Sequence, residues 1–440
     1  MARRRRNKLP LDPIEVEIES LDHEGRGITH NDGKIMFVDG ALPGETVLCR
    51  YTQKKRRFDQ ARTVEVIKAS PERIDAKCPH FGVCGGCSLQ HMSDDKQLEV
   101  KQGVLLEQFE HIGQVSIPEV LPPLRDGLWN YRRKARLGAR YVEKKEKLMV
   151  GFRERYGRYL TDMSRCEVLH ESVGERIEVL QELIRSLDEY KQIAQIEIAV
   201  GDNATAMVFR NLVELEQGDR DKLTAFAKEN PDVQVWLQPK GPETAAPLWP
   251  EDSSLFYELP DYELKMFFLP TDFTQVNAGL NRKMIPYAIE LLELESSHSV
   301  LDLFCGLGNF SLPLAKHASK VIAVEGDEGL VQRARENAQA NGVENVQFEV
   351  ADLFEGVPSG IENVDRLLLD PPRTGALEIV SQIEKLGPQR IVYVSCNSAT
   401  LARDAGVLVN EKGYKLLKAG VMDMFPHTAH AEAIAVFEKV

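Results

Sequence analysis

The feature that most constrains this chain is a series of strand–turn–helix units that begins near residue 275. Residues 299–318 predict a buried strand, a glycine-containing turn and a helix, and residues 321–342 predict a second strand followed by a helix. Strands that alternate with helices are typical of a parallel, doubly wound sheet. Ligands of such sheets bind outside the carboxyl ends of the strands. We therefore expect a ligand site where these strands end.

The turn after the first strand and the ends of the next two strands indicate what the ligand is. Gly306 and Gly308 allow the backbone to approach a ligand closely, but the chain reads Asn-Phe-Ser where a dinucleotide-binding turn has its third glycine, which argues against NAD. Glu325 ends the second strand and can accept both ribose hydroxyls of a nucleoside. Asp352 ends the third strand and can reach an adenine amino group. These units predict a cofactor that contains a nucleoside.

The whole series resembles the class I S-adenosylmethionine-dependent methyltransferases. A fourth strand ends in Asp370-Pro371-Pro372. This tripeptide is similar to the Asp/Asn-Pro-Pro motif that occurs where such enzymes act on planar nitrogenous substrates. The resemblance implies S-adenosyl-L-methionine as the cofactor.

A cysteine at the end of the fifth strand narrows the range of possible methyl acceptors. Cys396 is the middle residue of Ser-Cys-Asn, and we expect it beside the edge of the sheet where the cofactor binds. Nitrogen and oxygen acceptors already have a lone pair, whereas C5 of uracil becomes nucleophilic only after a thiolate has added to C6. A base must then remove the C5 proton, and Glu432 near the C-terminus is the candidate, with His430 and His427 as weaker ones.

In their order along nearly the whole chain, these motifs resemble the bacterial RNA uracil-C5 methyltransferases, in the branch that acts on 23S ribosomal RNA. The resemblance implies Cys396 as the nucleophile and Glu432 as the base. It also implies cofactor contacts from Gln275, Phe304, Asn309, Glu325, Asp352 and Asp370. One departure is the tail AHAEAI, where the family has an apolar branched residue before the glutamate; the role of Glu432 is unaffected.

Three of the seven cysteines lie within ten residues, at Cys78, Cys84 and Cys87. Clustered thiols in a protein without a secretory signal indicate a metal site or catalysis, and this set needs a fourth ligand. Outside the methyltransferase motifs Cys49 and Cys166 remain, and the family resemblance points to Cys166. A single C-x2-C pair with two solitary ligands favours a [4Fe–4S] cluster over zinc.

The sequence of the N-terminal part predicts an RNA-binding region. Short alternating strands over residues 15–68, with a tight hairpin at Asn31-Asp32-Gly33, resemble the OB-like TRAM β-barrel. Residues 1–160 carry 30 Lys and Arg against 23 Asp and Glu, and residues 161–440 carry 25 against 45. The basic residues occur in runs at 3–6, 54–57 and 131–136, with aromatic residues interleaved (Phe58, Tyr131, Phe152 and Tyr156), a composition that suits RNA.

We therefore expect three parts in an α/β chain. Residues 1–70 form the TRAM-like barrel, and residues 71–270 form a central α+β domain with the cysteine cluster and basic, RNA-facing strands. Residues 271–440 form the Rossmann-like methyltransferase domain, and the Pro-rich stretch 238–252 is a loop or linker. We further expect a monomer located in the cytoplasm, with no membrane association and 23S ribosomal RNA as its substrate.

Two other functions are compatible with parts of this pattern. A transfer-RNA uracil-C5 methyltransferase would use the same chemistry, but such enzymes usually lack both the front barrel and the cysteine cluster. A non-catalytic RNA-binding iron–sulfur protein would not need both the Ser-Cys-Asn and the His-Ala-Glu motifs.

Overall fold

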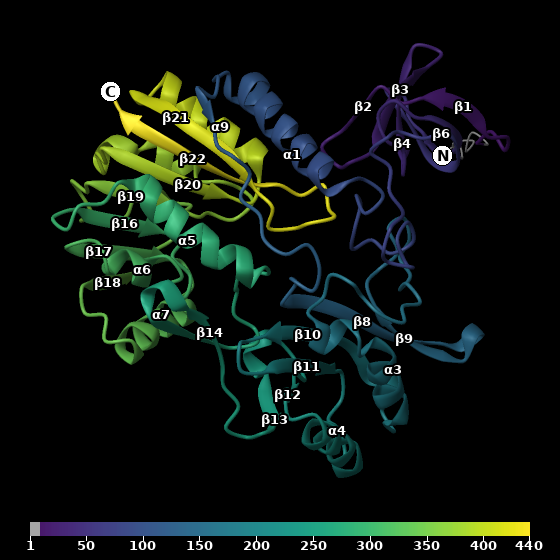
Figure 1. Ribbon diagram of the computed structural model, residues 1–440. Helices are drawn as coiled ribbons and strands as arrows, with labels where there is room; N and C mark the ends of the chain where they lie inside the picture. Colours follow the sequence, from purple (N-terminus) through teal and green to yellow (C-terminus); the bar gives the residue numbers. More distant parts are fainter. Residues whose placement is uncertain (1–8) are drawn as a thin grey trace, which may run out of the picture. The chain divides into compact units, whose positions relative to one another are not determined.

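The computed structural model describes residues 9–440, so the predicted basic run at 3–6 lies outside the described residues (Figure 1). By its contacts the chain divides into two compact units. The first comprises residues up to Val104 together with His427–His430, and the second comprises Leu105–Pro426 and Ala431–Val440. Within residues 9–440, no helix is both long and apolar enough to cross a membrane.

The first unit is built on a six-stranded sheet with the order β1-β5-β6-β4-β3-β2. Its strands are β1 (Ile14–Glu17), β2 (Ser20–Leu21), β3 (Gly27–Asn31), β4 (Lys34–Asp39), β5 (Thr46–Lys54) and β6 (Asp59–Lys68). β1 also contacts β3, so the sheet curls back on itself. The predicted hairpin is confirmed, because β3 and β4 are joined through Asp32 and Gly33, which both have positive φ.

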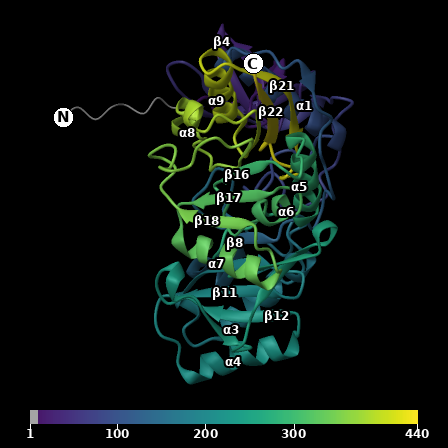
Figure 2. The ribbon, with the colours of Figure 1, turned by 90° about the vertical axis from the view of Figure 1, so that its left-hand side faces the viewer.

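The second unit contains two large sheets, of which the first is mixed and has the order β13-β12-β11-β10-β8-β9. Its strands are β8 (Lys134–Val142), β9 (Lys147–Gly151), β10 (Ile193–Val200), β11 (Thr205–Asn211), β12 (Val233–Leu237) and β13 (Ala246–Trp249). The helices connected to it are α2 (Glu171–Gly174), α3 (Ile177–Ser186) and α4 (Gln217–Glu229), of which Figure 2 shows α3 and α4 below the other sheet.

The prediction that residues 238–252 form only a loop is wrong. β13 pairs with β12 at the edge of the sheet, and Pro247 lies within it. An edge strand tolerates proline because one row of its N–H groups has no ladder partner. The antiparallel hairpin β14 (Leu255–Leu259) and β15 (Leu264–Phe268) follows.

The second large sheet has eight strands in the order β18-β17-β16-β19-β20-β22-β21-β7. Its strands are β7 (Glu119–Val120), β16 (Ser299–Leu303), β17 (Lys320–Glu325), β18 (Val346–Val350), β19 (Arg366–Leu369), β20 (Arg390–Ser395), β21 (Tyr414–Met422) and β22 (Glu432–Lys439). The first five in spatial order run parallel, and β22 is antiparallel to both of its neighbours. The predicted doubly wound sheet is confirmed.

Helices cover both faces of this sheet. One apolar cluster joins the sheet to α5 (Ala278–Leu292), α6 (Ser311–Ala315) and α7 (Glu328–Ala340). A second cluster joins the other face to α8 (Leu377–Ser381), α9 (Ser398–Asn410) and the π-helical turn Phe109–Gly113 that ends α1 (Asp94–Gln108). Strands buried on both faces explain the uninterrupted apolar runs of the sequence.

Candidate active site

A cavity of about 420 Å³, here called the strand-end cavity, opens where the parallel strands of the eight-stranded sheet end. Its volume is within the range of small-molecule sites. The cavity brings together every residue predicted for catalysis or cofactor binding. These are Gln275, Phe304, Asn309, Glu325, Asp352, Asp370, Cys396 and Glu432.

The turn after β16 forms one wall of the cavity. Gly306 and Gly308 have φ of 55° and 95°, and Phe304 has φ of 65°, a conformation that a non-glycine residue rarely adopts. The N–H of Gly306 donates to Oε2 of Glu325 at 3.1 Å, and the N–H of Gly326 donates to Oε1 at 2.7 Å. The carboxylate of Glu325 is thereby fixed at the end of β17.

Asn309 is held by two neighbours from other elements. Tyr257 on β14 donates its hydroxyl to Oδ1 of Asn309 at 2.8 Å, and Asn281 on α5 exchanges two amide hydrogen bonds of 2.9 Å with the same side chain. Burial raises the pKa of Tyr257 far above its usual range, so it stays a neutral donor. No motif pointed to Tyr257, because only the packing of the β14–β15 hairpin brings it to the cavity.

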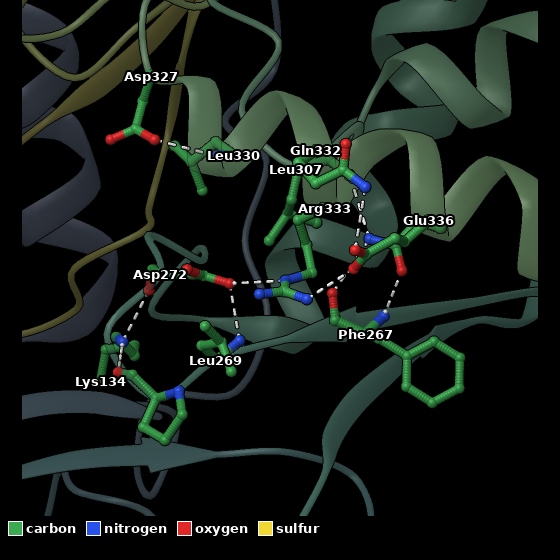
Figure 3. Close-up of polar contacts among 12 residues, drawn as sticks. Lys134, Phe267, Leu269, Asp272, Leu307, Asp327, Leu330, Gln332, Arg333 and Glu336 are labelled. Atoms are coloured by element: carbon green, nitrogen blue, oxygen red, sulfur yellow. Dashed lines mark hydrogen bonds and ion pairs between the residues drawn. The ribbon is translucent and has the colours of Figure 1, made fainter. Parts of the chain in front are cut away.

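The segment that carries Gln275 is anchored just before that residue, at Asp272 (Figure 3). The carbonyl of Asp272 accepts from Nζ of Lys134 on β8 at 2.8 Å. Its carboxylate accepts from the N–H of Leu269 at 2.7 Å and from Nε of Arg333 on α7 at 3.4 Å. Asp272 therefore joins the mixed sheet to the helix that follows Glu325.

Asp370 lines the cavity, and its charge acts on the fully buried carboxyl group of Asp302. Burial raises the pKa of Asp370 to about 7. Burial, with a smaller effect of the charges of Asp370 and Glu325, raises the pKa of Asp302 to about 7 as well, against the hydrogen bond it accepts from Ser311. Near neutral pH both carboxyl groups are therefore partly protonated.

Cys396 follows β20 and shares the cavity with Arg373 of the Asp-Pro-Pro-Arg loop. Burial, followed by the charges of Glu432 and Asp370, raises the pKa of the Cys396 thiol to about 11, and Arg373 opposes this rise. The carbonyl of Arg373 accepts from Nδ2 of Asn397 at 2.9 Å, which ties the loop to the residue after the cysteine. Arg373 is a cavity residue that the motif analysis did not single out.

Glu432 reaches the cavity because β22 runs antiparallel to β20. The register ends with Ser395 paired with Ala433, so Cys396 follows and Glu432 precedes this last pair, and both side chains line the cavity. Glu432 is buried. His427 and His430, the weaker candidates for the base, belong to the other compact unit.

The predicted cluster ligands lie in two different units, with Cys78, Cys84 and Cys87 in the first and Cys166 in the second. Within residues 9–440 no group of three or more His, Cys, Asp or Glu side chains that could hold a metal ion is found. The donor set itself suits an iron–sulfur cluster, because the N–H of Gly86 points at Sγ of Cys84 from 3.4 Å and Cys84 is buried. The ligand set stays a prediction.

The fold and the strand-end cavity define an S-adenosylmethionine-dependent methyltransferase with a Rossmann-like domain. The family profile described as tRNA (Uracil-5-)-methyltransferase matches residues 257–440, and the TRAM domain profile matches residues 12–64. The chain is 51% identical to the 23S rRNA (uracil(1939)-C(5))-methyltransferase RlmD of Hahella chejuensis and 52% identical to that of Alkalilimnicola ehrlichii, each over 99% of both chains. The chain belongs to the RlmD family of 23S rRNA uracil-C5 methyltransferases.

A solved structure supports the same conclusion about the fold. The chain is similar to the Pyrococcus abyssi tRNA (uracil-54, C5)-methyltransferase in complex with S-adenosyl-L-homocysteine, with a TM-score of 0.75 and 25% sequence identity. The match covers 96% of this chain and 99% of that one. The predicted family, the TRAM domain and the methyltransferase fold are confirmed.

Proposed function

We propose that this protein methylates C5 of the uridine of 23S ribosomal RNA that its relatives modify, number 1939 in their names. The observation that carries the proposal is the strand-end cavity, which Cys396 and Glu432 line together with the residues predicted to bind the cofactor. A cofactor site alone would suit many methyl acceptors. A thiol facing a carboxylate suits a carbon acceptor such as uracil C5.

The residues of the cavity fit S-adenosylmethionine, which supplies the methyl group when it is bound. Glu325 would accept the ribose hydroxyls, and Asp352 would accept the adenine amino group. Asn309 is held in a fixed orientation by Tyr257 and Asn281. Gln275, Phe304 and Asp370 complete the predicted contacts.

The chemistry of the chain's own residues is a sequence of addition and elimination. The Cys396 thiolate adds to C6 of the uracil, and the electron pair of the C5–C6 double bond moves to form an enolate. C5 would then form its new bond to the methyl carbon of bound S-adenosylmethionine, while the bond between that carbon and the sulfonium sulfur breaks and S-adenosylhomocysteine leaves. Glu432 removes the C5 proton, the double bond returns, and the C6–S bond breaks to release the Cys396 thiolate.

The test is to incubate the purified protein with labelled S-adenosylmethionine and either a 23S rRNA fragment or a transfer RNA, and to map the product by mass spectrometry. We expect 5-methyluridine at one site of the 23S fragment, and none with Cys396→Ala, which should still bind the cofactor with near wild-type affinity. Retention of more than a few per cent of the activity by this variant would exclude the covalent mechanism. Methylation of the transfer RNA alone would move the chain to the transfer-RNA branch.

We also propose that Cys78, Cys84, Cys87 and Cys166 hold a [4Fe–4S] cluster. This cluster stabilises the fold and takes no part in methyl transfer. The spacing of the cysteines and the N–H of Gly86 directed at a cysteine sulfur support this. The same proposal includes a division into three domains: an RNA-binding domain (1–70), a central domain (71–270) and a catalytic domain (271–440). It also includes a monomeric state and a cytoplasmic location.

A further inference from the structure

A second cavity, of about 840 Å³, lies over the β8–β9 hairpin and shares no lining residue with the strand-end cavity. We call it the hairpin cavity. Only two acidic residues, Glu143 and Glu154, line it. Six of its lining residues are basic and three are aromatic: Arg136, Arg140, Lys144, Lys145, Arg153, Arg158, Tyr141, Phe152 and Tyr159.

The fold builds this cavity from two hairpins. The segment after β9 turns back on itself, because the N–H of Thr161 donates to the carbonyl of Phe152 at 2.8 Å and the N–H of Glu154 donates to that of Tyr159 at 2.9 Å. Gly138 on β8 allows this second hairpin to approach, since a Cβ there would lie only 2.7 Å from Cδ2 of Leu160. Both walls of the cavity are thus fixed by backbone hydrogen bonds and close packing.

Several cations of the hairpin cavity are available to a ligand. Arg140, Lys144, Arg153 and Arg158 are exposed, and within residues 9–440 none of them makes an ion pair with a carboxylate. A concave surface on which unpaired cations outnumber the acidic residues attracts a polyanion. Each phosphate that it neutralises adds to the affinity and to its salt dependence.

The basic run at 131–136, predicted to face RNA, is by contrast used mainly inside the protein. Arg133 forms an ion pair with Asp202 at 2.5 Å, and Nζ of Lys134 donates to the carbonyl of Pro270 at 2.6 Å. Tyr131 is buried. Of this run, Arg136 lines the hairpin cavity, and the other cations of the cavity lie further along the chain.

Tyr159 adds an aromatic surface between these cations. It is 59% exposed, and the guanidinium carbon of Arg158 lies 5.6 Å from the centre of its ring. An exposed ring beside arginines is an arrangement on which unpaired bases stack. An acidic peptide would use the charges but would gain nothing from the ring.

We propose that the hairpin cavity binds an unpaired segment of the substrate RNA, with a base stacked on Tyr159 and phosphates bound by Arg140 and Arg153. The proposal rests on the proposed function, because it takes RNA as the substrate. It gives the enzyme a second, separate contact with the RNA strand beyond the target uridine.

The experiment measures binding of a single-stranded 23S rRNA fragment by fluorescence anisotropy over a range of salt concentrations. The variant Arg140→Ala/Arg153→Ala should lower the slope of log affinity against log salt by about 1.4, since a single-stranded phosphate contact contributes about 0.7. Tyr159→Ala should weaken binding by about tenfold and leave the slope unchanged. The matched control is Lys147→Ala, which removes an exposed cation of the same hairpin that is paired with Asp162 at 2.7 Å and lies outside the cavity.

The readouts separate this proposal from the proposed function. All variants should bind S-adenosylmethionine as the wild type does and keep kcat at saturating RNA, while KM for RNA rises. If the variants bind RNA no more weakly than Lys147→Ala, or if polyglutamate competes as well as RNA does, the hairpin cavity is not an RNA site. If the wild-type protein binds RNA in this way but methylates no uridine, the proposed function fails and the binding site stands.

Discussion

The reactivity of Cys396 toward iodoacetamide should report the electrostatics of the strand-end cavity. Burial and two carboxylates raise the pKa of this thiol to about 11. Because only the thiolate reacts, the alkylation rate should rise about tenfold per pH unit up to that value, whereas an exposed thiol levels off near pH 8.5. At pH 8 about one thousandth of Cys396 is then thiolate, compared with about a quarter of an exposed cysteine.

The assay exposes ligand-free protein briefly to iodoacetamide between pH 7 and 10.5 and quantifies the modified Cys396 peptide by mass spectrometry. Glu432→Gln removes a charge that raises the pKa and should shift the profile to lower pH. Arg373→Ala removes the opposing charge and should shift it to higher pH. Cys49 is an internal control, because burial alone raises its pKa to about 11 and neither substitution should affect it.

A wild-type profile that levels off below pH 9, or variants that shift in the same direction, would refute this account of the cavity.

The expected profile has a mechanistic consequence. A thiol that is almost fully protonated at neutral pH must lose its proton when the substrate binds, since the thiolate is the nucleophile. Ligand-free enzyme would then be protected from non-specific alkylation and oxidation.

Three further predictions concern other parts of the protein. Glu432→Gln should accumulate a denaturant-stable RNA adduct that carries the transferred methyl group and is bonded to Cys396; a folded, cofactor-binding variant without adduct would assign the base elsewhere. Protein purified anaerobically should contain about four iron and four sulfide ions per chain. The variant Cys166→Ser should lose most of this iron and sulfide, whereas Cys49→Ser should keep it. One zinc ion per chain in place of the iron would contradict the cluster. The pKa of Asp302 is raised from 3.8 to about 7 in the folded protein, so the folded state binds more protons than the unfolded state between these pH values. The melting temperature should therefore fall as pH rises from about 4 to 7. The variant Asp302→Asn should flatten this dependence, and an unchanged pH profile in the variant would show that the carboxyl group titrates normally.

The residues at strand ends could be predicted from the sequence because of a simple geometric rule. In a parallel sheet every carboxyl end lies at the same edge, so Glu325, Asp352, Asp370 and Cys396 had to meet once the strands were recognised. Tyr257 could not be found in this way. It lies on a hairpin outside the sheet, and its contact with Asn309 depends on tertiary packing that no local pattern encodes.

The directions of individual side chains in the basic run and the partners of the proline-rich stretch could not be predicted for a related reason, because composition does not say which way a side chain points. Lys134 begins β8 and is directed into the protein, where carbonyl groups of the segment before Gln275 bind its ammonium group. Pro247 is accepted in β13 only because that strand is at the edge of its sheet. Whether a strand is at an edge depends on its partners, which lie elsewhere in the sequence.

The pairing of Cys396 with Glu432 follows from topology more than from either motif alone. The proposed nucleophile follows a parallel strand, so it lies at the carboxyl edge of the sheet. The proposed base begins a strand, and the first residue of a strand lies at that same edge only if the strand runs in the opposite direction. β22 does so, and because its last pair with β20 is Ser395 and Ala433, Cys396 and Glu432 come next to that pair and line the same cavity. The single antiparallel insertion between β20 and β21 is therefore what allows one sheet edge to supply both the thiol and the carboxylate.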